Sequence, residues 1–172
     1  SRPKGWVGRL ALDTETTGLS ITEDFPLYWS LSDGVRRWCI DAELLLEGTF
    51  DRLFCDQDRY WVFANPKYDL HMLANYNTPI PRGRKYDVIG MSLFVEDNGL
   101  HGLKAQAKRD LGIHMADFKE VVKFRRNADM PFELLNPNNY AVVSDYASLD
   151  AYVTWLLSEL HAEKLENIHY GG

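Results

Sequence analysis

Four acidic residues of this 172-residue chain lie where the surrounding sequence is mostly apolar. Asp13 ends an apolar run that begins at Trp6, and Glu15 follows two positions later. Since side chains at positions i and i+2 of an extended segment point to the same side, both carboxylates leave the end of this strand together. The alternative interpretation is a solvated strand end, because Asp and Thr favour turns.

Asp69 and Asp150 each lie in a predicted helix. Asp69 closes the motif Asn65-Pro-Lys-Tyr-Asp69, in which Asn suits the N-cap and Pro the first helical position. Asp150 interrupts a mostly apolar stripe with helical spacing, and Tyr146 lies one turn before it on the same face. A carboxylate in such a stripe must be neutralised, hydrogen-bonded or bound to a metal. The alternatives are a favourable helix-dipole contact for Asp69 and a satisfied buried Asp150.

Four carboxylates converging within about 4–6 Å could not all stay ionised without a counter-charge. Hard divalent cations supply that charge, and an all-oxygen site favours Mg²⁺ or Mn²⁺ over zinc. Two such ions about 3.5–4 Å apart are suited to in-line attack of water on a phosphodiester. The sequence contains no Gly-rich phosphate loop, Cys nucleophile or Ser-His-Asp order that competes with this interpretation.

Three motifs in chain order carry a family resemblance. Leu12-Asp13-Thr14-Glu15-Thr16, Asn65-x-x-x-Asp69 and Tyr146-x-x-x-Asp150 resemble the exonuclease motifs of the DEDD superfamily in its tyrosine branch. They are most similar to those of the proofreading 3′–5′ exonuclease domain of family-A DNA polymerases, and His101-Gly-Leu-Lys104 resembles the start of that domain's intervening helix. The histidine branch would need a histidine at position 145, where this chain has Asp145.

The resemblance implies an α/β ribonuclease-H-like fold, with a mixed β-sheet flanked by helices. It implies that Asp13, Glu15, Asp69 and Asp150 hold two divalent metal ions, Mg²⁺ or Mn²⁺. Tyr146 would orient the attacking water rather than act as a base, because a free tyrosine has a pKa near 10. The residues implied to contact substrate are Thr16, Gly18, Leu19, Asn65 and Tyr68. The alternative interpretations are that Gly18 is a turn residue, Leu19 a core residue, Asn65 a helix cap and Tyr68 a packed aromatic residue.

The implied activity is metal-dependent hydrolysis of single-stranded DNA from its 3′ end, releasing nucleoside 5′-monophosphates in proofreading or strand trimming. A polymerase domain or subunit is the implied partner. One alternative is an RNase D-like exoribonuclease acting on RNA. The other is a non-catalytic, nucleic-acid-binding remnant of a polymerase, although all four acids and Tyr146 are present.

The elements that must position these residues can be read from the hydrophobic pattern. Strands are predicted at 6–14, 26–31, 35–40 and 59–64, with a hairpin at Ser32-Asp33-Gly34. Helices are predicted at 41–54 (interrupted at Gly48), 65–76, 87–95, 102–111, 116–124 and 140–166, with loops around Arg82–Lys85 and at 136–139. Strands followed mostly by helices indicate one α/β domain spanning residues 1–172.

Charge and composition set the remaining limits. The net charge of −6 argues against a phosphate-rich partner, but residues 82–126 carry ten Lys or Arg against six acids and could line a strand-binding path. Cys39 and Cys55 form neither a disulfide framework nor a zinc module. No apolar run reaches the roughly 18–20 residues of a membrane span, and the first residues show no signal-peptide core. We therefore expect a cytoplasmic protein without membrane contact.

Overall fold

A five-stranded mixed sheet forms the centre of the fold in the computed structural model, which describes residues 2–16, 23–24, 26–46, 48–76, 79–95, 99–116 and 136–170. The strands lie in the order β3-β2-β1-β4-β5. Their bounds are β1 Leu10–Thr16, β2 Pro26–Ser32, β3 Arg37–Asp41, β4 Tyr60–Phe63 and β5 Arg84–Asp87. The β1–β2 and β2–β3 pairs are antiparallel, whereas β1–β4 and β4–β5 are parallel. The predicted mixed α/β sheet is confirmed, with β1 at its centre.

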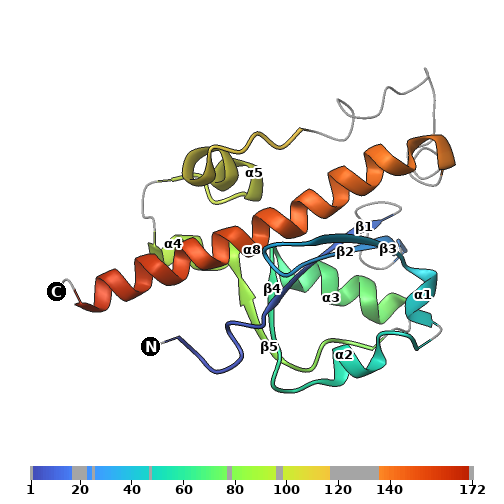
Figure 1. The fold of residues 1–172 in the computed structure, drawn as a ribbon, viewed down its shortest axis with the longest axis horizontal. Helices are drawn as coiled ribbons and strands as arrows, with labels where there is room; N and C mark the ends of the chain where they lie inside the picture. The colour runs from blue at the N-terminus through green and yellow to red at the C-terminus, as the bar shows by residue number, and fades with distance from the viewer. Residues whose placement is uncertain are drawn as a thin grey trace.

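Helices pack on both faces of this sheet (Figure 1). On one side lies the long helix α8 (Tyr140–Tyr170), together with α4 (Val88–Val95), α5 (Leu103–Gln106) and a π-helical turn at Ala107–Leu111. On the other side lie α1 (Glu43–Leu46), α2 (Asp51–Cys55) and α3 (Pro66–Asn75). A short 3₁₀ turn, Pro137–Asn139, leads into α8. Within the described parts of the chain, no helix combines the length and apolar character that a bilayer span requires.

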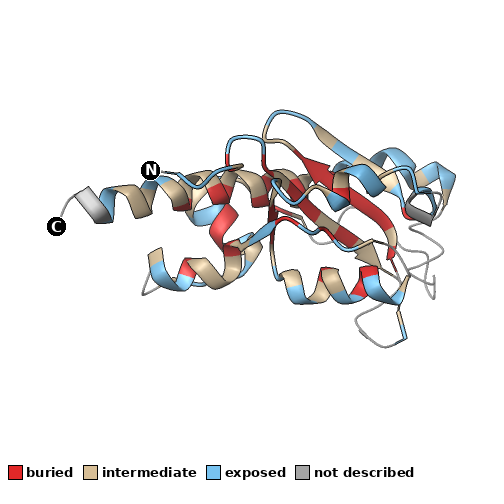
Figure 2. Ribbon diagram, turned by 90° about the horizontal axis from the view of Figure 1, so that it is seen from below, coloured by how far each residue is buried: buried red, intermediate tan, exposed pale blue. Residues whose placement is uncertain are grey.

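The alternation of side chains along β1 divides the hydrophobic core in two. Ala11 packs with Ala151 and Leu157 of α8, whereas the next residue, Leu12, packs with Leu73 of α3 on the opposite face. The buried residues concentrate in the strands and in the part of α8 that covers them (Figure 2). Because the side-chain period of a strand is two, this division also sends Asp13 and Glu15 towards α8.

The predicted hairpin between β2 and β3 is confirmed. Asp33 Oδ1 accepts hydrogen bonds from the backbone N–H of Val35 (3.0 Å) and of Arg36 (2.6 Å). Gly34 has a φ of +87°, and a Cβ at this position would lie 2.5 Å from the Trp155 ring. Glycine is therefore required both by the backbone conformation and by the close packing of the hairpin on α8.

Several predicted elements differ in the structure. The segment containing Arg84 and Lys85, predicted as a loop, is strand β5, because it pairs in parallel with β4 although its own residues are polar. The first strand begins at Leu10 rather than Trp6, since residues 4–8 form turns. Residues 136–139 include a 3₁₀ turn rather than an irregular loop alone. Most of the helix predicted at 116–124 lies outside the described residues, and Ala116 itself is not helical.

Candidate active site

Three of the four predicted acidic residues meet at the end of β1. Asp13, Glu15 and Asp150 each offer a carboxylate oxygen, and these oxygens lie within 4.8 Å of one another. Strand alternation places Asp13 and Glu15 on the face of the sheet covered by α8, and α8 contributes Asp150. All three residues are half-buried. This carboxylate cluster supplies the all-oxygen ligand set that hard divalent cations prefer.

The carboxyl groups of the cluster are difficult to ionise, because they are buried and their negative charges repel one another. Burial, followed by repulsion from neighbouring carboxylates, holds the pKa values of Asp13 and Glu15 well above their usual range. Burial also raises the pKa of Asp150 to about 6, although hydrogen bonds with Asp13 and Glu15 and the positive charge of Lys104 oppose that rise. Carboxyl groups that hydrogen-bond one another must share protons, so a bound cation would displace protons from this cluster.

Asp69 lies close to the carboxylate cluster but is held separately. It is 2% exposed in the first turn of α3, and its Oδ1 accepts a 2.6 Å hydrogen bond from Thr14 Oγ1. Its Oδ2 is buried and has no hydrogen-bond partner among the described residues. Burial raises the pKa of Asp69 to about 8, and its charge raises the pKa values of Asp13 and Glu15. A buried oxygen without a partner fits a role as a ligand for a cation beside the cluster.

Asn65 precedes α3 in an unusual backbone conformation. It has a φ of 64° and a ψ of 68°, the left-handed region, and its side chain makes no capping hydrogen bond. Asn65 thus occupies the predicted N-cap position, and its carbonyl oxygen accepts a 3.2 Å hydrogen bond from the Tyr68 N–H, but its side chain does not cap the helix. Instead its backbone N–H donates to Asp87 Oδ1 at 3.2 Å. Asn tolerates this conformation better than most residues.

Two further residues predicted to contact substrate, Thr16 and Tyr68, lie at the end of β1 and in the first turn of α3. Thr16 Oγ1 and the Tyr68 hydroxyl are 2.6 Å apart, which joins the end of β1 to the start of α3. Tyr146 is half-buried on α8 and packs with Tyr28 and Val143. Gly18 and Leu19 lie outside the described residues.

Lys104 lies at this site, which the sequence pattern does not predict. The pattern indicates only that Lys104 belongs to the basic segment 82–126, whereas in the structure its charge lowers the pKa values of both Glu15 and Asp150. Lys104 and Asp150 also line one cavity of about 530 Å³. The motif His101-Gly-Leu-Lys104 is the sequence feature that marks this lysine.

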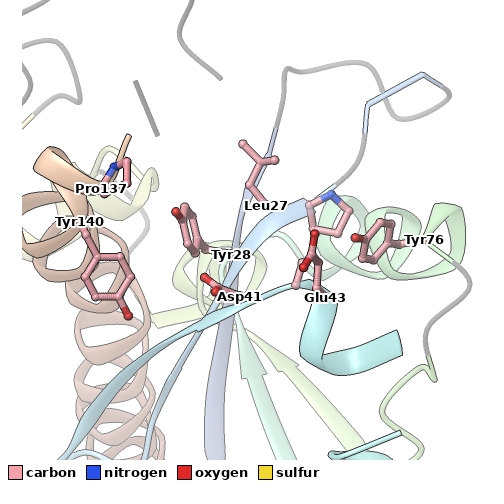
Figure 3. Close-up of a pocket in the computed structure, with 9 residues that line it drawn as sticks. Leu27, Tyr28, Asp41, Glu43, Tyr76, Pro137 and Tyr140 are labelled. Atoms are coloured by element: carbon pink, nitrogen blue, oxygen red, sulfur yellow. The ribbon is translucent and has the colours of Figure 1, made fainter. Parts of the chain in front are cut away.

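A second cavity, of about 670 Å³, is lined by the start of β2, the end of β3 and the start of α8. Tyr28 is the direct β2 neighbour of Glu15, and Asp41 is in turn the direct β3 neighbour of Tyr28. In Figure 3 the Tyr28 ring lies between the rings of Tyr140 and Tyr76, and Asp41 lies below Tyr28. We call this hollow the tyrosine cavity; its described lining residues are Pro26, Leu27, Tyr28, Asp41, Ala42, Glu43, Tyr76, Pro137 and Tyr140.

The chain matches a known protein family over most of its length. The model of the 3′–5′ exonuclease family matches residues 4–166. The chain belongs to the 3′–5′ exonuclease family. The exonuclease is thus an enzyme of a family that needs divalent metal ions, and both the predicted family and the predicted enzyme class are confirmed.

Solved structures share the exonuclease's fold at low sequence identity. Brucella melitensis NrnC is 21% identical with a TM-score of 0.72, over 94% of this chain and 76% of NrnC; other NrnC structures hold Mg²⁺ or pGG. Escherichia coli RNase D, an exoribonuclease involved in structured RNA processing, is 16% identical with a TM-score of 0.66, over 92% of this chain and 40% of RNase D. The POL domain of Pol1 from M. smegmatis, in complex with DNA primer-template, is 14% identical with a TM-score of 0.67, over 94% and 24%. Comparison with curated protein sequences finds no match.

Proposed function

We propose that this exonuclease hydrolyses single-stranded DNA from the 3′ end, releases nucleoside 5′-monophosphates, and comprises a single domain over residues 1–172. The observation that carries the proposal is the carboxylate cluster of Asp13, Glu15 and Asp150, whose oxygens lie within 4.8 Å of one another at the end of the central strand. Together with the buried, unpartnered Oδ2 of Asp69, the cluster offers ligands for two divalent ions, Mg²⁺ or Mn²⁺.

The metal ions and Tyr146 would have different roles in the hydrolysis. When bound, the two ions would activate water and neutralise charge on the phosphodiester. Tyr146 lies one helical turn before Asp150, and its hydroxyl would orient the attacking water by a hydrogen bond. A phenol of ordinary pKa near 10 is protonated at neutral pH, which suits an orienting group rather than a general base.

Substrate contacts are proposed around the same edge of the sheet. The Thr16–Tyr68 hydroxyl pair, together with Asn65, Gly18 and Leu19, would meet the last nucleotides. The tyrosine cavity adds the half-exposed Tyr140 ring, 49% exposed, on which a base could stack. Stacking on aromatic rings suits single strands, whose bases have free faces.

An RNA substrate is the second candidate, because NrnC in complex with pGG and the exoribonuclease RNase D share this fold. The fold shared with the M. smegmatis Pol1 structure supports proofreading beside a polymerase domain or subunit. A purely non-catalytic role is disfavoured, since a protein that only bound nucleic acid would not need three half-buried carboxylates with unfavourable mutual charge.

Degradation of matched oligonucleotides tests the proposal. DNA and RNA strands of one sequence, labelled at the 5′ end, are incubated with Mg²⁺, Mn²⁺ or EDTA, and the products are resolved by length. We expect a metal-dependent ladder that shortens from the 3′ end, faster on DNA, and no ladder with Asp13→Ala/Glu15→Ala. The control variant Asp51→Ala removes an exposed acid of α2 and should keep full activity. An active, folded double-alanine variant would refute the proposed site, whereas a faster RNA ladder would favour the second candidate.

A further inference from the structure

A cavity of about 530 Å³ separates the start of α5 from the carboxylate cluster. Asp150 of α8 lines this cavity together with His101, Gly102, Lys104 and Met115. Lys104 is the one lysine or arginine among the described residues that line this cavity. The cavity thus brings one long cationic side chain and one proposed metal ligand to the same hollow.

The wall that carries Lys104 is fixed by buried polar contacts. Gln106 is fully buried, and its Nε2 donates to the carbonyl oxygens of His101 (2.6 Å) and Val88 (3.2 Å). Because Gln106 Nε2 is a donor, its Oε1 must accept the 2.9 Å hydrogen bond from His161 Nε2. Ser92 Oγ lies 2.7 Å from His101 Nδ1. These contacts hold the turn before Lys104 against α4 and α8.

Charge balance indicates what the cavity would accept. Four carboxylates and two divalent ions, as in the proposed function, would cancel one another. Lys104, whose charge already acts on Glu15 and Asp150, would then leave one positive charge beside the cluster. A phosphodiester carries one negative charge, and an ammonium group is a strong donor to phosphate oxygens.

We propose that this cavity is a phosphate subsite, in which the Lys104 ammonium donates a hydrogen bond to a non-bridging oxygen of the phosphodiester held at the carboxylate cluster. The proposal rests on the proposed function, since it assumes a nucleic-acid substrate at that cluster. Lys104 is then a catalytic residue, and Gln106 and His161 are positioning residues that act through the turn before it. The same subsite would hold the phosphate of the released nucleoside monophosphate.

The competing role for Lys104 is that of a counter-ion, which pairs with the carboxylates only while no metal is bound. Both roles predict that Lys104→Met leaves Mg²⁺ affinity unchanged or increases it, because a positive charge is removed from beside the cation. They differ for the substrate. A phosphate ligand is needed for substrate and product binding, whereas a counter-ion is not.

The test compares Lys104→Met and Lys104→Arg with the control Lys4→Met, which removes the same charge from an exposed position outside the basic segment 82–126. Three quantities are measured: kcat/KM on a DNA oligonucleotide, inhibition by the product dAMP, and Mg²⁺ binding without substrate by calorimetry. For Lys104→Met we expect kcat/KM to fall and the dAMP inhibition constant to rise by about 10- to 100-fold each. Mg²⁺ binding should not weaken, Lys104→Arg should stay near wild type, and Lys4→Met should change each value less than about twofold.

Two results would overturn the subsite. One is a Lys104→Met variant with substrate and product constants equal to those of Lys4→Met, which would leave Lys104 a counter-ion. The other is a loss of activity accompanied by weaker Mg²⁺ binding, which would make Lys104 a support for the carboxylates. A wild-type protein that degrades no oligonucleotide would instead contradict the proposed function itself, so the two failures are distinguishable.

Discussion

Thr14 Oγ1 donates a 2.6 Å hydrogen bond to Asp69 Oδ1, which ties the central strand to the first turn of α3. Thr14 lies between Asp13 and Glu15 in β1, so its side chain points to the opposite face of the sheet. One short stretch of strand therefore directs two carboxylates towards α8 and positions a third through its intervening threonine. The Asp-Thr-Glu order accounts for the separate environment of Asp69.

Thr14→Val should weaken both stability and catalysis. The substitution keeps the β-branched shape but leaves the buried Asp69 Oδ1 without its hydroxyl donor. The free energy of unfolding should fall by about 1–3 kcal/mol. Because that hydrogen bond lowers the pKa of Asp69, its loss should also raise the pKa further and weaken Mg²⁺ binding. Urea denaturation and Mg²⁺ titration measure the two effects, and Thr14→Ser should behave as wild type. Equal stability of the Val and Ser variants would contradict this role.

The metal-free protein should lose stability as the pH rises from 7 to 8. The pKa of Asp69 is raised to about 8, and those of Asp13 and Glu15 lie well above their usual range, so the folded state holds protons that the unfolded chain has released. When the native state binds more protons, the free energy of unfolding decreases with pH. Saturating Mg²⁺ should displace those protons and flatten the dependence.

Thermal unfolding between pH 7 and 8, with EDTA or with excess Mg²⁺, measures this effect. A change of 1 kcal/mol in the free energy of unfolding shifts the melting temperature by about 2–4 °C. His161 contributes little to the pH dependence in this range. Burial lowers its pKa to about 4, and its ring is mostly neutral above pH 7 in both the folded and the unfolded chain. Asp69→Asn should reduce the slope in EDTA. A melting temperature that rises with pH in EDTA would contradict the raised carboxylate pKa values.

Periodicity alone predicted the parts of the site that lie within single elements. The two-residue period of β1 placed Asp13 beside Glu15, and the helical stripe of α8 placed Tyr146 beside Asp150. Strand β5 was missed because its sequence Arg-Lys-Tyr-Asp has no apolar alternation and it forms by pairing with β4. Lys104 was missed because its position depends on the Gln106–His161 hydrogen bond, whose partners lie 55 residues apart. Contacts of that kind leave no local pattern in a single sequence.

Tyr140→Ala should weaken oligonucleotide binding at the tyrosine cavity. Tyr140 is 49% exposed, so its removal should cost little stability but remove a stacking surface. Loss of one base–aromatic stack corresponds to about 1–3 kcal/mol, and KM should rise about 5- to 100-fold with kcat little changed. The control is Val142→Ala, another exposed apolar residue of the same helix that does not line the cavity. If both variants shift KM equally, the tyrosine cavity does not bind substrate.

Tyr146→Phe should separate water orientation from binding. The ring of Tyr146 packs with Tyr28 and Val143, and phenylalanine preserves that packing while removing only the hydroxyl group. If the hydroxyl orients the attacking water, kcat should fall by about 10- to 100-fold, the loss of one hydrogen bond of about 1.4–2.8 kcal/mol in the transition state. KM and Mg²⁺ affinity should stay within about twofold, because the four acids are untouched. The dependence of kcat on pH should keep its wild-type shape, since an orienting phenol does not titrate near neutrality. If Tyr146 were a general base, its mutation would instead remove the part of the pH profile of kcat that reports its ionisation. The pH profiles of wild type and Tyr146→Phe therefore decide between the two roles.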